Sequence, residues 1–189
     1  MNNEINLCKD YVFDNFDVQV HNKFAYTTSV AVAEAPGINY NPLFIGGNNK
    51  DRIHLIHAIG NYVMKHFNYN VLYITATQYI EDIKSMTKEE LEDKYENVSL
   101  LIVDDIECLI ENAEVQLELL ELFNRLHSNN KQVVFSSNNH FDKLSNLDEN
   151  LRNTITWGIT INISQTDNDS PNEVIKDDNS KSFNYNWLG

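Results

Sequence analysis

The sequence contains few cysteines and few basic residues. Cys8 and Cys108 are the two cysteines among 189 residues, and neither lies in a CxxC or Cys/His cluster. We therefore expect no disulfide framework and no zinc site. We also expect no other bound metal and no cofactor. Lysine and arginine total 14 against 28 acidic residues, which gives a formal net charge of −14. Because proteins that bind duplex DNA present a basic face to its phosphates, this balance argues against a nucleic-acid partner and favours a protein partner.

Long apolar runs are also absent. No segment approaches the roughly 20 consecutive apolar residues that cross a bilayer, and the first residues, MNNEINLCKDYVFDNF, contain no signal-peptide core. We therefore expect a cytoplasmic protein with no membrane association. A hydrophobic content of 42% in a chain of this length is enough for one domain with a sizeable core.

Short apolar runs alternate with amphipathic segments along most of the chain. The runs that predict strands are PLFIGG, NVLYIT, SLLIVDD, QVVFSSN and ITINIS. The segments that predict helices are NKFAYTTSVAVAEAPG, DRIHLIHAIGNYVMKHF, TQYIEDIKSM, TKEELEDKYEN and AEVQLELLELFNRLHSNN. Thr87 to Glu90 has the pattern of a capping box. Because the strands are near-continuous apolar runs, the sequence predicts an α/β fold in which helices cover both faces of a parallel sheet.

Composition divides the chain into three parts. Residues 1–20 are polar with scattered aromatic rings and indicate an extended N-terminal arm. Residues 21–164 contain the predicted α/β core, and residues 165–189 form an acidic, polar tail. Its aromatic tip, Phe183, Tyr185 and Trp187, docks either on its own domain or on a partner.

The first predicted strand runs into a loop that resembles a phosphate-binding loop with the wrong residues. A functional loop reads GxxxxGK[ST], in which the lysine reaches phosphate oxygens and the hydroxyl holds Mg²⁺. Here Gly46 and Gly47 begin the pattern, but Asp51, Arg52 and Ile53 replace the glycine, lysine and hydroxyl residue. Asp51 would repel a polyphosphate, and Ile53 cannot coordinate a metal. We therefore predict the remains of a nucleotide site.

Polar residues also follow the third and fourth predicted strands. Asp104 and Asp105 lie where a carboxylate supports a metal, and they are equally compatible with the N-terminal cap of a helix. Ser137 and Asn138 lie where a polar residue would sense a γ-phosphate. His54 and His57 share a helix with no third ligand nearby in sequence, which favours packing over metal binding.

These pieces together resemble the AAA+ core of the DnaA replication-initiator family. The matching stretches are YVFDNFDVQVHNKFAYTTSVAVAEAPGINYNPLFIGG, HLIHAIGNYV, KYENVSLLIVDDIE, LFNRLHSNNKQVVFSSN and LDENLRNTITWGI. The likeness runs in order from Tyr11 to Ile163. It implies a three-layer α/β/α fold with a five-stranded parallel sheet of the P-loop NTPase type, and it places Asn22 near the adenine end of the site. It also implies that the protein acts at chromosome origins, where the family forms ATP-driven filaments that open DNA.

The chain departs from this family at the positions that handle ATP. The family's GxxGxGKT is GGNNKDRI here, and the arginine that one subunit offers to its neighbour's ATP falls on Thr154. A second family arginine falls on Asn150, which leaves Arg152 of that cluster. We also expect the family's helical lid and DNA-binding domain to be missing, and its helical insertion that contacts single-stranded DNA to be short and acidic. The residues of the degenerate nucleotide pocket are Asn22, Gly46, Gly47, Asp51, Arg52, Ile53, Asp104, Asp105 and Asn138.

The favoured hypothesis is a non-catalytic DnaA-like protein that regulates or adapts replication initiation. It would bind the initiator DnaA, or a related AAA+ helicase loader, and self-association stays open. The candidate contacts are the rim of the degenerate nucleotide pocket, which carries Arg52 and Arg152, and the aromatic tip. One alternative is a nucleotide-binding switch in which Lys50 or Arg52 replaces the lost lysine. Another is a module that binds single-stranded DNA through the shortened insertion.

Overall fold

The computed structural model describes residues 6–47 and 50–163, and within them five parallel strands form one sheet. The strands are β1 (Leu43–Gly46), β2 (Val71–Thr75), β3 (Leu100–Asp104), β4 (Gln132–Ser137) and β5 (Ile159–Asn162). Their order across the sheet is β2-β3-β4-β1-β5. Leu43 of β1 lies opposite Val134 of β4 on one side and Ile159 of β5 on the other. The predicted five-stranded parallel sheet is therefore confirmed.

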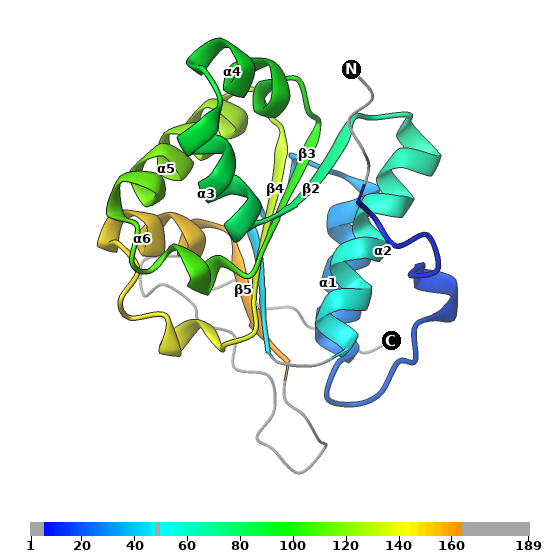
Figure 1. Ribbon diagram of the computed structural model, residues 1–189. Helices are drawn as coiled ribbons and strands as arrows, with labels where there is room; N and C mark the ends of the chain where they lie inside the picture. The colour runs from blue at the N-terminus through cyan, green and yellow to red at the C-terminus, as the bar shows by residue number, and fades with distance from the viewer. Residues whose placement is uncertain (1–5, 48–49, 164–189) are drawn as a thin grey trace.

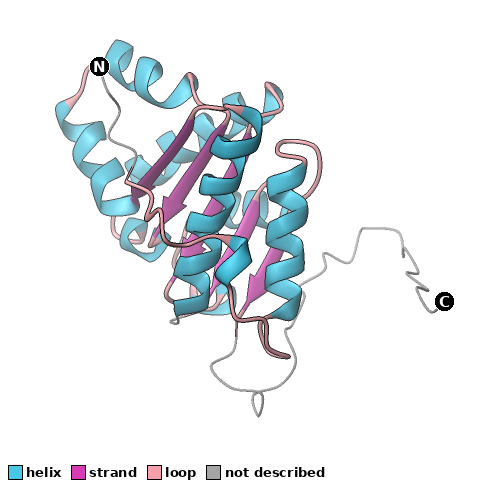
Figure 2. Cartoon of the chain, turned by 90° about the vertical axis from the view of Figure 1, so that its right-hand side faces the viewer, coloured by secondary structure: helices cyan, strands magenta, loops and turns pink. Residues whose placement is uncertain are grey.

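Helices cover both faces of this sheet, as the sequence predicts (Figure 1). One face carries α1 (Lys23–Glu34) and α2 (Lys50–Phe67), which stand in front of the strands in Figure 2. The other face carries α3 (Ala76–Ser85), α4 (Lys88–Glu96), α5 (Ala113–Ser128) and α6 (Glu149–Trp157). Two apolar clusters fill the interior, one on each side of the sheet. None of the helices in the described ranges is both long and apolar enough to span a bilayer.

The N-terminal arm packs on α1 and α2 through its aromatic rings. Phe13 and Phe16 both contact Tyr26 of α1, with ring centroids 5.9 and 5.5 Å apart. Leu7 and Phe16 are buried in the cluster on that side of the sheet. The arm thereby extends the apolar cover of α2 and brings the residues before α1 close to the start of α2.

A buried polar contact joins α3 to α4. The predicted capping box at Thr87 and Glu90 is present at the start of α4. Asp82 of α3 accepts hydrogen bonds from the ammonium of Lys94 and the hydroxyl of Tyr95, both on α4. Burial opposes ionisation of Asp82, but these two donors outweigh it and lower the pKa of the carboxyl. The ionised carboxylate therefore links α3 to α4 through two donors.

Sequence periodicity did not predict α6 as a helix of its own. Its start carries a clear local signal, because the Asp148 side chain caps the helix by accepting from the backbone N–H groups of Asn150 and Leu151. Leu151 and Ile155 then face the core. With nine residues the apolar pattern is too short to stand out without the cap.

Candidate functional site

The predicted pocket residues gather at the carboxyl ends of the strands. Gly46 ends β1 and Gly47 follows it, Asp104 ends β3 and Asp105 follows it, and Asn138 follows β4. The first turn of α2 carries Asp51, Arg52 and Ile53 to the same edge. Ligands of open parallel sheets bind at this edge, where the strand order reverses. Here β1 and β4 are neighbours although four α-helices and two strands separate them in the chain.

Arg52 turns inward and forms an ion pair with Asp104. Its side chain is only 2% exposed, and one guanidinium nitrogen, Nη1, donates to a carboxylate oxygen of Asp104 and to Ser136 Oγ at 3.0 Å. The other nitrogen, Nη2, donates to Asn138 Oδ1 at 3.0 Å and lies 3.4 Å from Asp105 Oδ1. A single planar guanidinium thus ties α2 to the ends of β3 and β4.

Asp104 accepts further hydrogen bonds from its own chain. The hydroxyl of Tyr73 on β2 donates to Oδ2 at 2.9 Å, and the hydroxyl of Ser136 and the backbone N–H of Asp105 donate to Oδ1. Burial and the negative charge of Asp104 raise the pKa of Tyr73, so its phenol remains a donor. Burial also raises the pKa of Asp105, and the neighbouring Asp104 carboxylate adds to that shift. Both oxygens of the Asp104 carboxylate therefore accept hydrogen bonds from within the protein.

Asp105 does not act as the helix cap that was one of the two sequence interpretations. It precedes the 3₁₀ helix η2 (Ile106–Leu109) with a left-handed backbone, φ 57°, and makes no side-chain cap bond. Its carboxylate instead accepts from Asn138 Nδ2 at 2.8 Å. Asn138 also donates to Glu107 Oε1 at 2.9 Å. Asn138 therefore connects Arg52 to two carboxylates, while the neighbouring Ser137 accepts from the backbone of Asn139.

The two glycines have packing reasons that do not involve a phosphate. A Cβ on Gly46 would lie 2.7 Å from the carbonyl oxygen of Asn139 and 2.8 Å from Oδ1 of Asn162. Gly47 has φ +132°, and a Cβ there would lie 2.6 Å from the carbonyl oxygen of Ile163. The close approach of β1 to its neighbours is enough to require glycine at both positions.

Asp51 holds the arm against α2. Its Oδ2 atom accepts from Asn22 Nδ2 at 2.8 Å and lies 3.2 Å from His21 Nε2. Asn22 in turn accepts from the backbone N–H of Gln19 and donates to the carbonyl of Asp17. An acidic side chain in the first turn also suits the positive end of the helix dipole. Two residues of the predicted pocket, Asn22 and Asp51, are thus bonded to each other.

Of the two rim cations, Arg52 is buried and Arg152 is partly exposed. The Arg152 guanidinium lies 4.8 Å from the centre of the Phe141 ring and 3.5 Å from the Phe141 carbonyl. Asn150 is exposed on the first turn of α6, whereas Thr154 is 2% exposed and faces the core. A surface contact at this rim therefore depends on Arg152, while Phe183, Tyr185 and Trp187 lie outside the described residues.

Arg52, Asp104, Asp105, Asn138, Tyr73 and Ser136 form one hydrogen-bonded cluster around Arg52. Two of its members, Tyr73 and Ser136, were not identified from the sequence. Both lie inside predicted strands, where a polar atom is easily taken for a strand-face residue. Ser136 carries the only available signal, because it breaks the apolar run of QVVFSSN before the strand ends. Within the described ranges, no three His, Cys, Asp or Glu side chains are placed to hold a metal ion.

His54 and His57 of α2 contact the arm. His54 Nε2 lies 2.8 Å from the carbonyl oxygen of Val12. His57 Nδ1 accepts from the backbone N–H of Cys8 at 3.3 Å, and its ring lies 4.6 Å from that of Tyr73. Burial lowers the pKa of His57, and the positive charge of Arg52 adds to this effect although Asp104 opposes it.

Acidification should therefore destabilise the fold through His57. Its folded pKa lies below the ordinary value of about 6.5, so near that pH the unfolded chain binds more protons than the native chain. We expect the free energy of unfolding, measured in urea, to fall as the pH is lowered from 7.5 to 5.5. His57→Gln should flatten this slope, whereas His127→Gln, on exposed α5 surface, controls for the loss of a histidine. An unchanged slope in His57→Gln would show that this ring is not the sensitive group.

Comparison with known proteins gives one consistent result. A family model described as the bacterial DnaA ATPase domain matches residues 7–162. The chain is 38% identical over 186 residues to the chromosomal replication initiator protein DnaA of Streptococcus mutans, which covers 94% of this chain and 41% of that protein. The chain thus spans about two fifths of the length of this curated relative.

Solved structures agree with this match. Domain III of the Thermotoga maritima replication initiation protein DnaA aligns with a TM-score of 0.78 and 33% identity, over 84% of this chain and 68% of that chain. The DnaC helicase loader aligns with a TM-score of 0.64 and 14% identity, over 82% of this chain and 96% of that chain. The second likeness is one of fold alone.

Proposed function

The chain belongs to the bacterial DnaA ATPase-domain family, and we propose that it is a non-catalytic member that acts in replication initiation by binding another protein. Its partner would be the initiator DnaA or a helicase loader of the same AAA+ fold, met in the cytoplasm. Binding to such a partner would regulate or adapt initiation without hydrolysis of ATP by this chain.

The observation that carries this proposal is the buried ion pair between Arg52 and Asp104. In a working site of this type, the loop cation reaches the phosphates and the strand-end carboxylate supports Mg²⁺. Here the two side chains bond to each other and to Ser136, so neither is directed toward a ligand. Opening the pair to admit a nucleotide would leave buried charges without partners, which is strongly unfavourable.

The remaining residues of the pocket also do not fit Mg-ATP. Ile53 has no oxygen with which to hold the metal. Asp51 places a carboxylate in the first turn of α2, where a helix N-terminus would otherwise attract phosphate. Asn22, at the adenine end, is already bonded to that carboxylate. We therefore derive no catalytic step through a nucleotide in this chain.

Binding should depend on the exposed rim or on the aromatic tip. We expect Arg152→Glu to weaken capture of DnaA or the helicase loader of the source organism by about tenfold. The substitution removes a cation that would pair with an acidic group of the partner, and the new carboxylate would repel that group. Surface plasmon resonance with the immobilised full chain measures this, and the melting temperature should change little. Lys65→Glu, in the last turn of α2 and at the opposite edge of the sheet, is the matched charge-reversal control.

A second variant separates the two candidate contacts. If the aromatic tip is the contact, deletion of the residues after Ser180 should abolish capture while Arg152→Glu has no effect. If both variants bind as the parent does, neither surface is used. If the parent captures neither the initiator nor a loader, the proposed role in initiation is wrong and the family assignment stands alone.

A further inference from the structure

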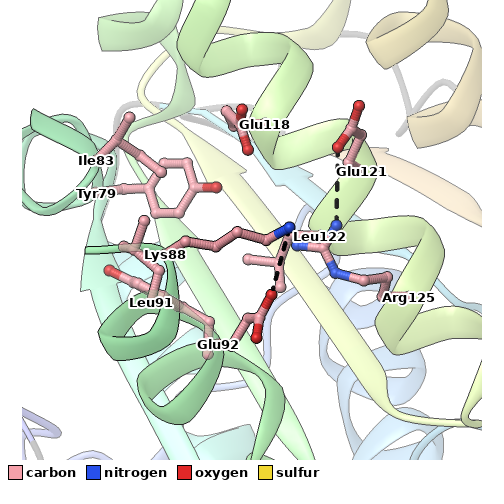
Figure 3. Close-up of a pocket in the computed structure, with 10 residues that line it drawn as sticks. Tyr79, Ile83, Lys88, Leu91, Glu92, Glu118, Glu121, Leu122 and Arg125 are labelled. Carbon is pink, nitrogen blue, oxygen red and sulfur yellow. Dashed lines mark ion pairs between the residues drawn. The ribbon is translucent and has the colours of Figure 1, made fainter. Parts of the chain in front are cut away.

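A pocket lies between the α3–α4 pair and α5, on the face of the sheet opposite α1 and α2 (Figure 3). It shares no lining residue with the cluster around Arg52. Its volume is about 290 Å³, near the lower end of the roughly 300–1,000 Å³ typical of ligand sites. A space of this size suits an amino-acid side chain better than a dinucleotide or another large cofactor.

The floor of the pocket is apolar and aromatic. Tyr79 and Ile83 of α3, Leu91 of α4 and Leu122 of α5 line it. Tyr79 and Leu122 are each 2% exposed, so the floor continues into the core and is firmly held. Such a floor favours an occupant with an apolar stem.

One buried polar group points into this space. The hydroxyl of Tyr79 is directed between Lys88 and Glu118 in Figure 3, and it has no hydrogen-bond partner among the residues that the structure describes. Tyr95, which packs against it edge to face at 5.2 Å between ring centroids, instead gives its own hydroxyl to Asp82. The Tyr79 residue is 2% exposed, but its hydroxyl is not one of the fully buried atoms without a partner, so it faces the open space of the pocket and is available to an occupant. The occupant should therefore carry a polar group at the depth of Tyr79.

The cations on the rim are already paired within the protein. Lys88 lies 3.8 Å from Glu92 on the same helix. Arg125 lies 2.6 Å from Glu96 and 3.8 Å from Glu121. The described lining carries three carboxylates, Glu92, Glu118 and Glu121, against these two cations, and this acidic balance argues against a phosphate or a nucleic acid as occupant.

Glu118 is the rim carboxylate that has no ion pair within the described chain. It stands on α5 above Tyr79, with its side chain at the mouth of the pocket. A cation that enters between Glu118 and Tyr79 would give the carboxylate an ion pair and the hydroxyl a hydrogen-bond partner. The net charge of −14 attracts such a cation from a distance.

We propose that this pocket binds an arginine side chain from a basic segment of a partner protein. The methylene stem lies over Leu122 and Ile83, and the guanidinium donates to the carboxylate of Glu118 and to the hydroxyl of Tyr79. Arginine fits better than lysine because its planar group donates in two directions and stacks on the Tyr79 ring. The inference concerns a surface separate from the rim and the aromatic tip, and it does not require the partner to be a replication protein.

Methyl NMR on the full chain tests this directly. The probes are the blocked dipeptide acetyl-Leu-Arg-amide and its neutral isostere, acetyl-Leu-citrulline-amide. We expect the arginine peptide to shift the methyl signals of Ile83, Leu91 and Leu122 with a Kd of about 1 mM or tighter. The citrulline peptide should bind at least fivefold more weakly, because it keeps the shape and loses the charge.

Two variants locate the contacts within the pocket. Glu118→Gln should weaken the arginine peptide about fivefold or more, while Glu114→Gln, one turn earlier on α5 and outside the pocket, should change it less than twofold. Tyr79→Phe removes only the hydroxyl and should weaken binding about threefold. Melting temperatures of all variants establish that the fold is intact.

Several results would overturn the proposal. Equal binding of the two peptides would show that the positive charge does not contribute to binding. The absence of any methyl shift at 10 mM peptide would show that the pocket does not bind an arginine side chain. Pocket methyls that shift on dilution of the free chain would identify a second copy as the occupant. Pocket methyls that shift when Phe183, Tyr185 and Trp187 are replaced by alanine would identify the chain's own tip. Because no replication protein is used, each outcome is independent of the proposed role in initiation.

Discussion

Replacing Arg52 with methionine should lower the free energy of unfolding by about 3–5 kcal/mol, which is the usual effect of removing one partner from a buried ion pair. Methionine keeps most of the stem volume, so the loss reports the guanidinium and not a cavity. Without it, Asp104 stays buried beside Asp105 with no compensating cation. Urea denaturation at neutral pH, followed by circular dichroism, measures the change.

The chain offers a matched control for this substitution. Arg125 of α5 also pairs with a carboxylate, Glu96 at 2.6 Å, but its side chain is 45% exposed. Arg125→Met should therefore lower the stability by no more than about 1 kcal/mol. If both substitutions have the same small effect, the cluster around Arg52 does not hold the strand ends together.

A double variant shows whether the two charges act as a unit. Arg52→Met combined with Asp104→Asn removes both charges and leaves an amide to bond with Tyr73 and Ser136. The double variant should lose less free energy of unfolding than the sum of the two single losses, by more than about 1 kcal/mol. The reason is that neither charge is then left unpaired. Strict additivity would show that Arg52 and Asp104 are not energetically coupled.

The architecture was predictable from local patterns, and the interior of the site was not. Five apolar runs and their helical partners fixed the layers, because each pattern concerns residues close in sequence. The same kind of local comparison predicts that Arg52 does not suit a phosphate loop. Its inward turn onto Asp104 and Ser136 depends on β3, β4 and α2 meeting at one edge, and that meeting is set by strand order.

The bond between Asn22 and Asp51 illustrates the same limit. From sequence, Asp51 was a negative charge in the wrong place, and Asn22 had a role only through the family resemblance. The structure places the two side chains 2.8 Å apart across a separation of 29 residues. The carboxylate that was predicted to repel a polyphosphate is thus a contact between α2 and the residue before α1. A contact of this kind depends on a residue that is distant in sequence, so it cannot be predicted from the residue type at one position.

The largest functional effect concerns Mg-ATP, for which we expect no measurable binding by the full chain. Calorimetry with up to about 1 mM nucleotide should give no heat beyond dilution, and thermal unfolding should be unaffected. A ligand present at 1,000 times its Kd would stabilise the fold by about 4 kcal/mol, so even a weak micromolar site would be visible as a clear rise in melting temperature.

A graded series of variants tests which of the three positions would prevent nucleotide binding. Arg52→Lys alone should not restore binding, because Ile53 still offers no oxygen to Mg²⁺ and Asp51 still repels the phosphates. Ile53→Thr with Arg52→Lys supplies the cation and the hydroxyl, and adding Asp51→Gly frees Asn22 and removes the repelling charge. If nucleotide binds only in the triple variant, each of the three positions prevents binding on its own. If instead the parent binds Mg-ATP with micromolar affinity, Arg52 must leave Asp104 to admit the nucleotide, and the ion pair would be a gate for an active switch.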